Sequence, residues 1–294
     1  MQRLAESSAH GLLAAMTAVL ARLPRRPAYW LGARFGDLAY LCLVRRRRVA
    51  LDNLAIAFDG EKSAAERRAI ARATFRRLGE HLIDFSRMRW LTPETAPLMF
   101  TVEGLERVEQ LLARQAGLLI LSAHFGSWEL ASAIALRLAP PMHVIARPLD
   151  NPALHRLVDA YRRYSGCSVI PKNQALSASL KALRRGDVVA LLMDQSSLRH
   201  EGIPVPFFGA EAYTSIGPAL MALRARCPVI GAFMVRQGLG KHRLVFSEEI
   251  PIQRSGNLRQ DIADNTRRFN QLIESYVRAY PDHWFWLHRR WKKR

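Results

Sequence analysis

Apolar positions recur along the chain with two different periods. Between residues 63 and 90 they return every three or four residues, and Ser63 with Glu66 forms the Ser-x-x-Glu signature of a helix start. From about residue 100, short apolar runs alternate with segments of helical length. The expected strands cover residues 117–121, 142–146, 168–170, 188–193, 229–235 and 244–246, and the expected helices cover 129–138, 151–165, 173–185, 215–226 and 257–280. This alternation predicts an α/β fold with a mainly parallel sheet flanked by helices.

Two weaker apolar stretches precede this region. Residues 7–21 carry no formal charge, and residues 35–44 are interrupted by Asp37 and end at the basic run Arg45-Arg46-Arg47-Arg48. Both stretches are shorter than the roughly 20 apolar residues of a membrane span, and basic residues are too sparse at the start for a signal peptide. They predict either membrane-associated helices or ordinary amphipathic helices packed on the domain. We expect attachment to anionic membrane lipids, because basic clusters beside apolar helices bind lipid head groups.

Composition narrows the function classes. The 294 residues include 44 Lys and Arg against 25 Asp and Glu, a formal net charge of +19 that attracts nucleic acid, anionic membranes, acidic carrier proteins or phosphorylated substrates. Three cysteines without CxxC spacing argue against a zinc ribbon and a disulfide scaffold. P-loop, dinucleotide-loop, HExxH and GxSxG signatures are absent, so we expect no metal and no cofactor. We expect a membrane-associated helical segment, residues 1–48, followed by an α/β domain, residues 49–294.

Candidate chemistry follows the first predicted core strand. His124 stands at the carboxyl end of that strand, where open α/β sheets collect functional groups, and Glu129 follows five residues later. A hydrogen bond between them would fix the imidazole tautomer and leave the other ring nitrogen free as a general base. Gly126 permits a tight turn, and N–H groups at the start of the next helix are natural oxyanion donors. The alternative is structural, with a histidine capping the loop and a glutamate in a first helical turn, where acids are favoured.

The same segment resembles a known motif. Residues 122–129, Ser-Ala-His-Phe-Gly-Ser-Trp-Glu, are similar to the histidine, four residues and acid of the glycerolipid acyltransferases in the lysophospholipid acyltransferase superfamily. More narrowly they resemble the late lipid A acyltransferases, the lauroyl and myristoyl transferases of Gram-negative bacteria. Further blocks resemble that family in the same order: residues 147–152, 193–195, 205–209 and 284–292. One departure is His283, where the family pattern leads us to expect glutamine.

The resemblance implies a reaction. A fatty acyl chain would pass from the thioester of acyl carrier protein to a hydroxyl of a lipid A precursor, at the cytoplasmic face of the inner membrane. His124 would take the hydroxyl proton, and Glu129 would orient the histidine. An alternative is transfer to another glycolipid or phospholipid with acyl-CoA as donor. A nucleic-acid-binding protein is a further rival, but no recognised nucleic-acid motif is present, so we expect no nucleic-acid partner.

Substrate contacts are expected at seven positions: Gly126, Arg147, Arg162, Asp194, Phe207, Phe208 and Thr214. The two arginines suit phosphate or carrier contacts because their N–H groups match phosphate in pairs, unless they are solvated helix-flanking residues. The aspartate either holds one of them or supports the site. The two phenylalanines, in residues 205–209, either line an acyl-chain pocket or pack in the core.

Aromatic and basic residues also gather at the C-terminus. Trp284, Trp286 and Trp291 stand among Arg289, Arg290 and the basic residues 292–294. This mixture predicts either a membrane interface, where amphipathic aromatics and basic side chains gather, or tryptophans packed on the core beneath a solvated basic tail.

Overall fold

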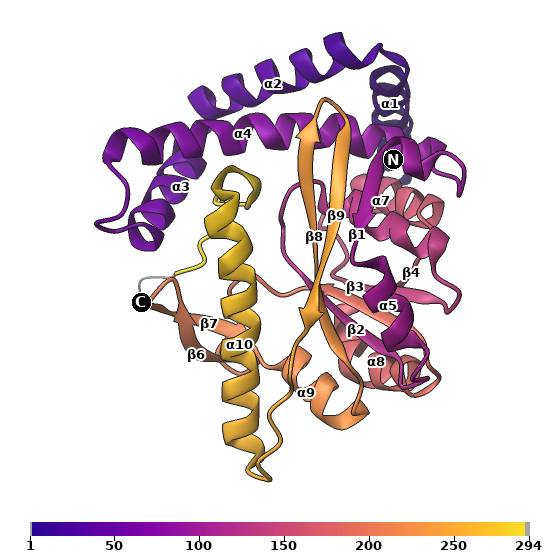
Figure 1. Cartoon of the computed structure of the whole chain (residues 1–294). Helices are drawn as coiled ribbons and strands as arrows, with labels where there is room; N and C mark the ends of the chain where they lie inside the picture. Colours follow the sequence, from indigo (N-terminus) through magenta and orange to yellow (C-terminus); the bar gives the residue numbers. More distant parts are fainter. Residues whose placement is uncertain (1, 292–294) are drawn as a thin grey trace.

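A single large sheet organises the protein (Figure 1). The computed structural model describes residues 2–291, with side chains described for residue 11 and residues 13–291. Within this part of the chain, seven strands follow the order β1-β9-β8-β2-β5-β3-β4. Their bounds are β1 Phe100–Glu103, β2 Leu118–Ser122, β3 Met142–Ala146, β4 Ser168–Pro171, β5 Val188–Leu192, β8 Val229–Gly238 and β9 Lys241–Glu249. Neighbouring strands run parallel except β8 and β9, which confirms the predicted mainly parallel α/β fold.

Helices cover both faces of this sheet. Side chains alternate across a strand, so Leu119 and Leu121 of β2 pack with α8, α9 and α10, whereas Leu118 and Ile120 pack with α5 and α7. These helices are α5 Leu105–Leu112, α7 Pro152–Tyr164, α8 Ala175–Arg184, α9 Gly217–Ala225 and α10 Leu258–Ala279. A short helix, α6 Trp128–Ala131, follows β2, and a separate antiparallel hairpin, β6 Gly202–Phe207 with β7 Ala210–Ser215, packs against α10. The sequence pattern did not indicate β1, α5 or this hairpin.

The chain begins with helices that pack on one another and on the sheet. They are α1 Gln2–Arg22, α2 Arg25–Cys42, α3 Val44–Ala57 and α4 Ala64–Arg87, and α4 starts at the predicted Ser63–Glu66 capping box. Figure 1 shows α2 lying along α4. Their backbones touch at two glycines, since a Cβ on Gly79 would lie 1.9 Å from the carbonyl oxygen of Gly32. Residues 48 and 49 both lie within α3, so this helix continues across the predicted domain boundary.

The outward side of α2 is apolar. Trp30, Phe35, Leu38 and Leu41 are each between 56% and 63% exposed to solvent. Among residues 2–291 we find no helix with the length and apolar character needed to cross a membrane. Attachment of these helices to a membrane therefore stays a prediction, and the exposed apolar side of α2 is the structural feature that bears on it.

A buried polar cluster ties α2 to the sheet. Asp84 of α4 accepts hydrogen bonds from Tyr29 of α2, from Arg236 of β8 and, at 3.1 Å, from His242 of β9. Burial favours the neutral acid, but His242 and Arg236 outweigh it and hold the pKa of Asp84 below its usual range. The N-terminal helices are thus fixed to the β8–β9 hairpin by a charge that water does not reach.

The C-terminal tryptophans lie inside the protein. Trp284 and Trp286 are 2% and 0% exposed, and their rings contact Phe207 and Phe208 respectively. Trp291 is half-buried and stacks on Phe207. The prediction of a membrane interface is wrong for these rings, because the indoles fill the space beside the β6–β7 hairpin. The basic residues 292–294 lie outside the described residues.

Candidate active site

His124 is held at the carboxyl end of β2 by a carboxylate from the neighbouring strand. Because β2 and β5 are parallel neighbours, His124 and Asp194 emerge at the same edge of the sheet. Asp194 Oδ1 lies 2.9 Å from His124 Nδ1, and Oδ2 accepts the backbone N–H of His124 at 3.1 Å. The indole N–H of Trp284 donates to Oδ2 at 2.8 Å. Asp194 is 2% exposed, so a dry, fully bonded carboxylate orients the imidazole.

This pairing shifts the pKa values of both His124 and Asp194. Burial opposes the charged imidazolium, but the charge and hydrogen bond of Asp194, with a contribution from Glu129, raise the pKa of His124 above its usual value. Burial likewise opposes the carboxylate, yet His124 and the Trp284 N–H hold the pKa of Asp194 below its usual value. Asp194 is therefore ionised at neutral pH, and it favours the tautomer that carries its proton on Nδ1. In that tautomer Nε2 has a free lone pair, as a general base requires.

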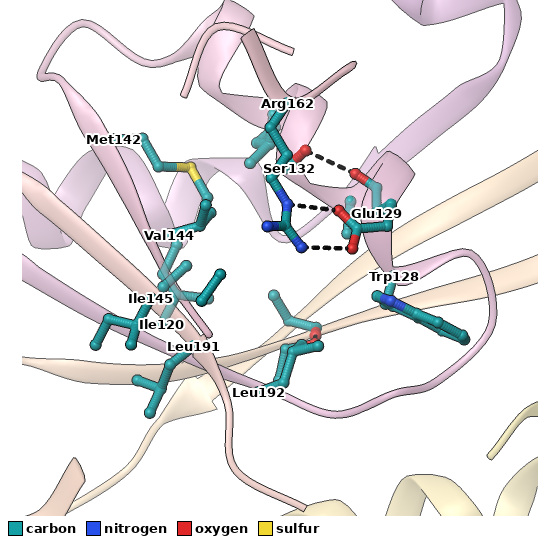
Figure 2. A pocket seen from close by; sticks show the side chains of 16 residues that line it. Ile120, Trp128, Glu129, Ser132, Met142, Val144, Ile145, Arg162, Leu191 and Leu192 are labelled. Carbon is teal, nitrogen blue, oxygen red and sulfur yellow. Dashed lines mark hydrogen bonds and ion pairs between the residues drawn. The ribbon is translucent and has the colours of Figure 1, made fainter. Parts of the chain in front are cut away.

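Glu129 does not orient His124, and that part of the prediction is wrong. Its carboxylate forms a two-pronged ion pair with Arg162 of α7, with Nε and Nη2 donating at 3.0 and 2.7 Å (Figure 2). Glu129 lies in the first turn of α6 beside α7, whereas the ring nitrogen that it was expected to bind is occupied by Asp194. What Glu129 contributes to His124 is its negative charge, which helps to raise the pKa of the imidazole. The same ion pair occupies Arg162, which was predicted to contact phosphate or carrier and has a side chain only 14% exposed.

Gly126 has the structural role that the sequence predicted, a close backbone approach. Its φ is +57°, and a Cβ there would lie 1.8 Å from the carbonyl oxygen of Met234. Its N–H donates to the carbonyl oxygen of His283 at 2.8 Å. The N–H of Phe125 donates to the carbonyl oxygen of Ala123, and the N–H of His124 donates to the Asp194 carboxylate. These three consecutive amides are thus bonded within the protein. These three amides are therefore not free to donate to a reacting carbonyl oxygen, whereas the oxyanion prediction concerned the N–H groups at the start of α6.

Gln195 supplies a hydrogen-bond donor beside His124. Its side-chain nitrogen lies 3.3 Å from His124 Nε2, on the opposite side of the ring from Asp194. Since Nε2 is an acceptor in the Nδ1–H tautomer, the amide donates to it. Gln195 was not among the predicted site residues. Its position directly after Asp194, in the block of residues 193–195, was the available signal.

An aromatic stack supports the loop that carries His124. His81 of α4 lies face to face with Trp128, with centroids 4.1 Å apart, and its Nδ1 is 3.1 Å from Ser127 Oγ. Trp128 in turn meets the His124 ring edge to face at 5.4 Å. Burial, opposed in part by Asp84 and Glu129, lowers the pKa of His81 to about 4, so this ring is neutral at physiological pH. In the sequence, His81 was only one polar position in the predicted helix over residues 63–90.

The remaining predicted contact residues are one exposed arginine and three core residues. Arg147 is exposed and pairs with Asp150. Phe207 and Phe208 are 1% and 5% exposed in the core, which corrects the prediction that they line an acyl-chain pocket. Thr214 is fully buried, and its hydroxyl accepts hydrogen bonds from Arg290 at 2.5 Å and Asn270 at 3.1 Å. Its predicted substrate contact is wrong, because these partners enclose it.

Two apolar spaces adjoin Trp128 and Glu129. One is a cavity of about 80 Å³ between α6, α7 and the sheet, floored by aliphatic side chains such as Ile120, Met142 and Val144 (Figure 2). The other is a groove of about 370 Å³ between α2 and α4, lined by apolar residues that include Phe35, Leu43, Phe75, Leu82 and Leu154. Trp128 and Glu129 line both, so both apolar spaces reach the short helix α6 that follows the His124 loop.

Comparison with known proteins shows the family of this chain. Residues 5–293 match the family model described as bacterial lipid A biosynthesis acyltransferase. The chain belongs to this family. It is 29% identical over 280 residues to the lipid A biosynthesis lauroyltransferase of Escherichia coli K12, covering 94% of this chain and 89% of the relative. It is 28% identical over 276 residues to the palmitoleoyltransferase of the same strain, covering 93% and 87%. The predicted family is confirmed, and the protein is an acyltransferase.

One relative comes from a different lipid pathway. The chain is 23% identical over 193 residues to a phosphatidylinositol mannoside acyltransferase of Mycobacterium tuberculosis, covering 65% of this chain and 59% of that relative. The reaction type is the same acyl transfer. The acyl donor and acceptor of the present acyltransferase are therefore argued from its own site.

Proposed function

We propose that this acyltransferase moves a fatty acyl chain from the thioester of acyl carrier protein to a hydroxyl of a lipid A precursor. The observation that carries the proposal is the His124–Asp194 pair: a buried carboxylate bonds Nδ1, and the imidazole side chain is still 24% exposed. Nε2 is then a base that a substrate hydroxyl can reach. The family and the named relatives support lipid A biosynthesis as the setting.

The proposed step needs only a base that returns its proton. His124 Nε2 takes the proton of the acceptor hydroxyl while the hydroxyl oxygen forms a bond to the thioester carbon. The carbonyl electron pair moves to oxygen and then returns, and the carbon–sulfur bond breaks. The leaving thiolate takes the proton from the imidazolium, so one ester and one thiol form for each thioester and alcohol consumed. Asp194 lowers the energy of the imidazolium during the step through its charge.

The groove between α2 and α4 suits the fatty chains. It is apolar, Trp128 lines it, and the Trp128 ring contacts the His124 ring. Arg46, in the basic run that follows α2, donates to the carbonyl oxygen of Leu287, a residue of the groove. This neighbourhood would place acyl chains beside apolar walls and the phosphates of an acceptor beside guanidinium groups.

Replacement of the base tests the reaction. His124→Ala should lower the rate of acyl transfer about 10²–10⁴-fold with little loss of structure, since general acid–base catalysis contributes a factor of this size. His143→Ala is the matched control, because His143 also pairs with a buried aspartate, Asp187, at 3.0 Å. Mass spectrometry of the acceptor lipid would measure transfer. Near wild-type transfer by folded His124→Ala protein would refute the assignment of the base.

The donor can be identified by salt. Acyl carrier protein is acidic and this enzyme carries +19, so the rate at subsaturating carrier should fall steeply between low and physiological ionic strength, with a smaller effect on the maximal rate. Acyl-CoA offers a much smaller charged surface, so its rate should depend less on salt. Equal rates with both donors, neither sensitive to salt, would instead favour the acyl-CoA enzyme of another glycolipid or phospholipid.

We further propose that the protein attaches to the cytoplasmic face of the inner membrane through the apolar side of α2. Leu38 and Leu41 are more than half exposed there, and the basic residues 45–48 follow directly. Replacing both leucines with serine should release the protein from anionic vesicles in a flotation assay. Leu258→Ser, at a leucine of α10 that is also about half exposed, is the control. Unchanged flotation of the double variant would overturn this attachment.

A further inference from the structure

Three consecutive amides that could serve the reacting carbonyl are already bonded. The N–H groups of residues 124–126 bond Asp194, Ala123 and His283, so they do not face the substrate. Acyl transfer builds negative charge on the carbonyl oxygen, and a catalytic site needs donors aimed at that oxygen. The donor must lie close to His124 Nε2, because the attacking hydroxyl bridges Nε2 and the carbonyl carbon.

Gln195 meets this requirement. Its amide nitrogen is 3.3 Å from His124 Nε2, so it already lies where the substrate must approach. The Nδ1–Asp194 bond leaves Nε2 as an acceptor, which makes the Gln195 amide the donor. The backbone before Gln195 is fixed, since the Met193 N–H bonds the Ser122 carbonyl oxygen at 3.1 Å and Asp194 is bonded on both oxygens.

We propose that Gln195 is a catalytic residue that donates a hydrogen bond to the thioester carbonyl oxygen. The acceptor hydroxyl takes the place of the amide at Nε2, and the displaced N–H turns to the adjacent carbonyl oxygen. As the new carbon–oxygen bond forms, the carbonyl pair becomes an oxyanion bound by this N–H. When the carbon–sulfur bond breaks, the pair returns and the thiolate takes the proton from His124. This role rests on the proposed function.

Two substitutions of Gln195 test whether its N–H donor, and not the packing of its side chain, contributes to the reaction. Gln195→Met keeps the length of the side chain and removes the N–H donor, so kcat should fall about 10²–10³-fold, with KM for each substrate within about threefold. Gln195→Glu places a carboxylate beside Nε2, which favours the imidazolium. The rising limb of the kcat/KM profile should then move to higher pH by about one unit. Gln174→Met, at an exposed glutamine in residues 172–174, is the matched control.

The outcomes distinguish this inference from the function beneath it. If the wild-type enzyme transfers no acyl group from carrier to lipid A precursor, the proposed function fails. If it does, and Gln195→Met matches Gln174→Met in kcat, or Gln195→Glu leaves the pH profile unmoved, then Gln195 is not the donor. A fall in kcat accompanied by an equal rise in KM, or by loss of the thermal unfolding transition, also overturns it, because either result indicates a structural role.

Discussion

Asp194→Asn is the sharpest test of how this site works. The carboxylate accepts from the Nδ1–H and the backbone N–H of His124 and from the indole of Trp284. Asparagine has one oxygen, which in the place of Oδ2 keeps both the backbone and the indole partner, and an amide nitrogen that would then face Nδ1. An amide donates, so it would hold the ring in the tautomer with the proton on Nε2. The base would then carry a proton where it needs a lone pair.

The size of the effect follows from the geometry. An Nδ1–Oδ1 distance of 2.9 Å puts the imidazolium and carboxylate charges about 4 Å apart, worth about 4 kcal/mol at an effective dielectric constant of about 20. Losing this stabilisation when the imidazolium forms slows the reaction by about 10³-fold. The wrong tautomer slows the reaction further. In serine proteases, the same aspartate-to-asparagine substitution beside the catalytic histidine lowers kcat about 10⁴-fold. We therefore expect a loss of about 10³–10⁴-fold in kcat.

The pH profile gives an independent measurement. Asp194 raises the pKa of His124, and only neutral His124 is a base, so wild-type activity should rise with pH through a value above the usual 6.5. Without the carboxylate the imidazolium is less favourable, and residual activity should rise at lower pH. Glu129→Gln also removes a charge, but it leaves the Asp194 bond intact, so most of the upward shift should remain.

A control lies at the other end of the same strand. Asp187 precedes β5, is 6% exposed and bonds His143 Nε2 at 3.0 Å, so Asp187→Asn makes the same exchange in a similar pair. Transfer to the acceptor lipid should be measured under saturating donor, with circular dichroism to confirm folding. The reasoning is refuted if Asp194→Asn and Asp187→Asn are equally active. It is also refuted if Glu129→Gln alone abolishes the rising limb of the profile.

Two further substitutions test the scaffold. Gly126→Ala should lower the free energy of unfolding, measured by chemical denaturation, by about 2–4 kcal/mol, because its Cβ would overlap a backbone oxygen and its φ is positive. Gly209 also has a positive φ but has open space around it, so Gly209→Ala is the control and should cost less. Asp84→Asn should cost about 3 kcal/mol, because it leaves Arg236 and His242 buried beside a neutral side chain; a loss below about 1 kcal/mol would contradict the role of this cluster.

Local patterns were sufficient for most elements of the fold. The helix that starts at Ser63, the strand before His124 and the parallel α/β class follow from periodicity and capping, which act between residues a few positions apart. The strand at Met142–Ala146 has the predicted bounds, because a short apolar run between turn residues limits its length on both sides. The β6–β7 hairpin was missed, since its alternation is interrupted by Pro204 and Pro206.

The hydrogen-bond partner of His124 was decided by the tertiary structure. Glu129 was the acid nearest in sequence, yet Asp194, 70 residues away, bonds His124 because β5 lies beside β2 in the sheet. Strand order depends on how helices and strands pack together, and a run of apolar residues does not encode its neighbour. The sequence by itself therefore determined that a histidine stands at the end of a buried strand.

The tertiary structure likewise decided between surface and core for the C-terminal tryptophans. An indole has an apolar body and one N–H donor, so it suits a membrane interface or any interior that offers an acceptor. The indole N–H of Trp284 donates to Asp194 and that of Trp286 donates to the carbonyl oxygen of Pro281, so both donors are hydrogen-bonded inside the protein. The residue type sets what an indole requires, and only the folded chain determines where that acceptor lies.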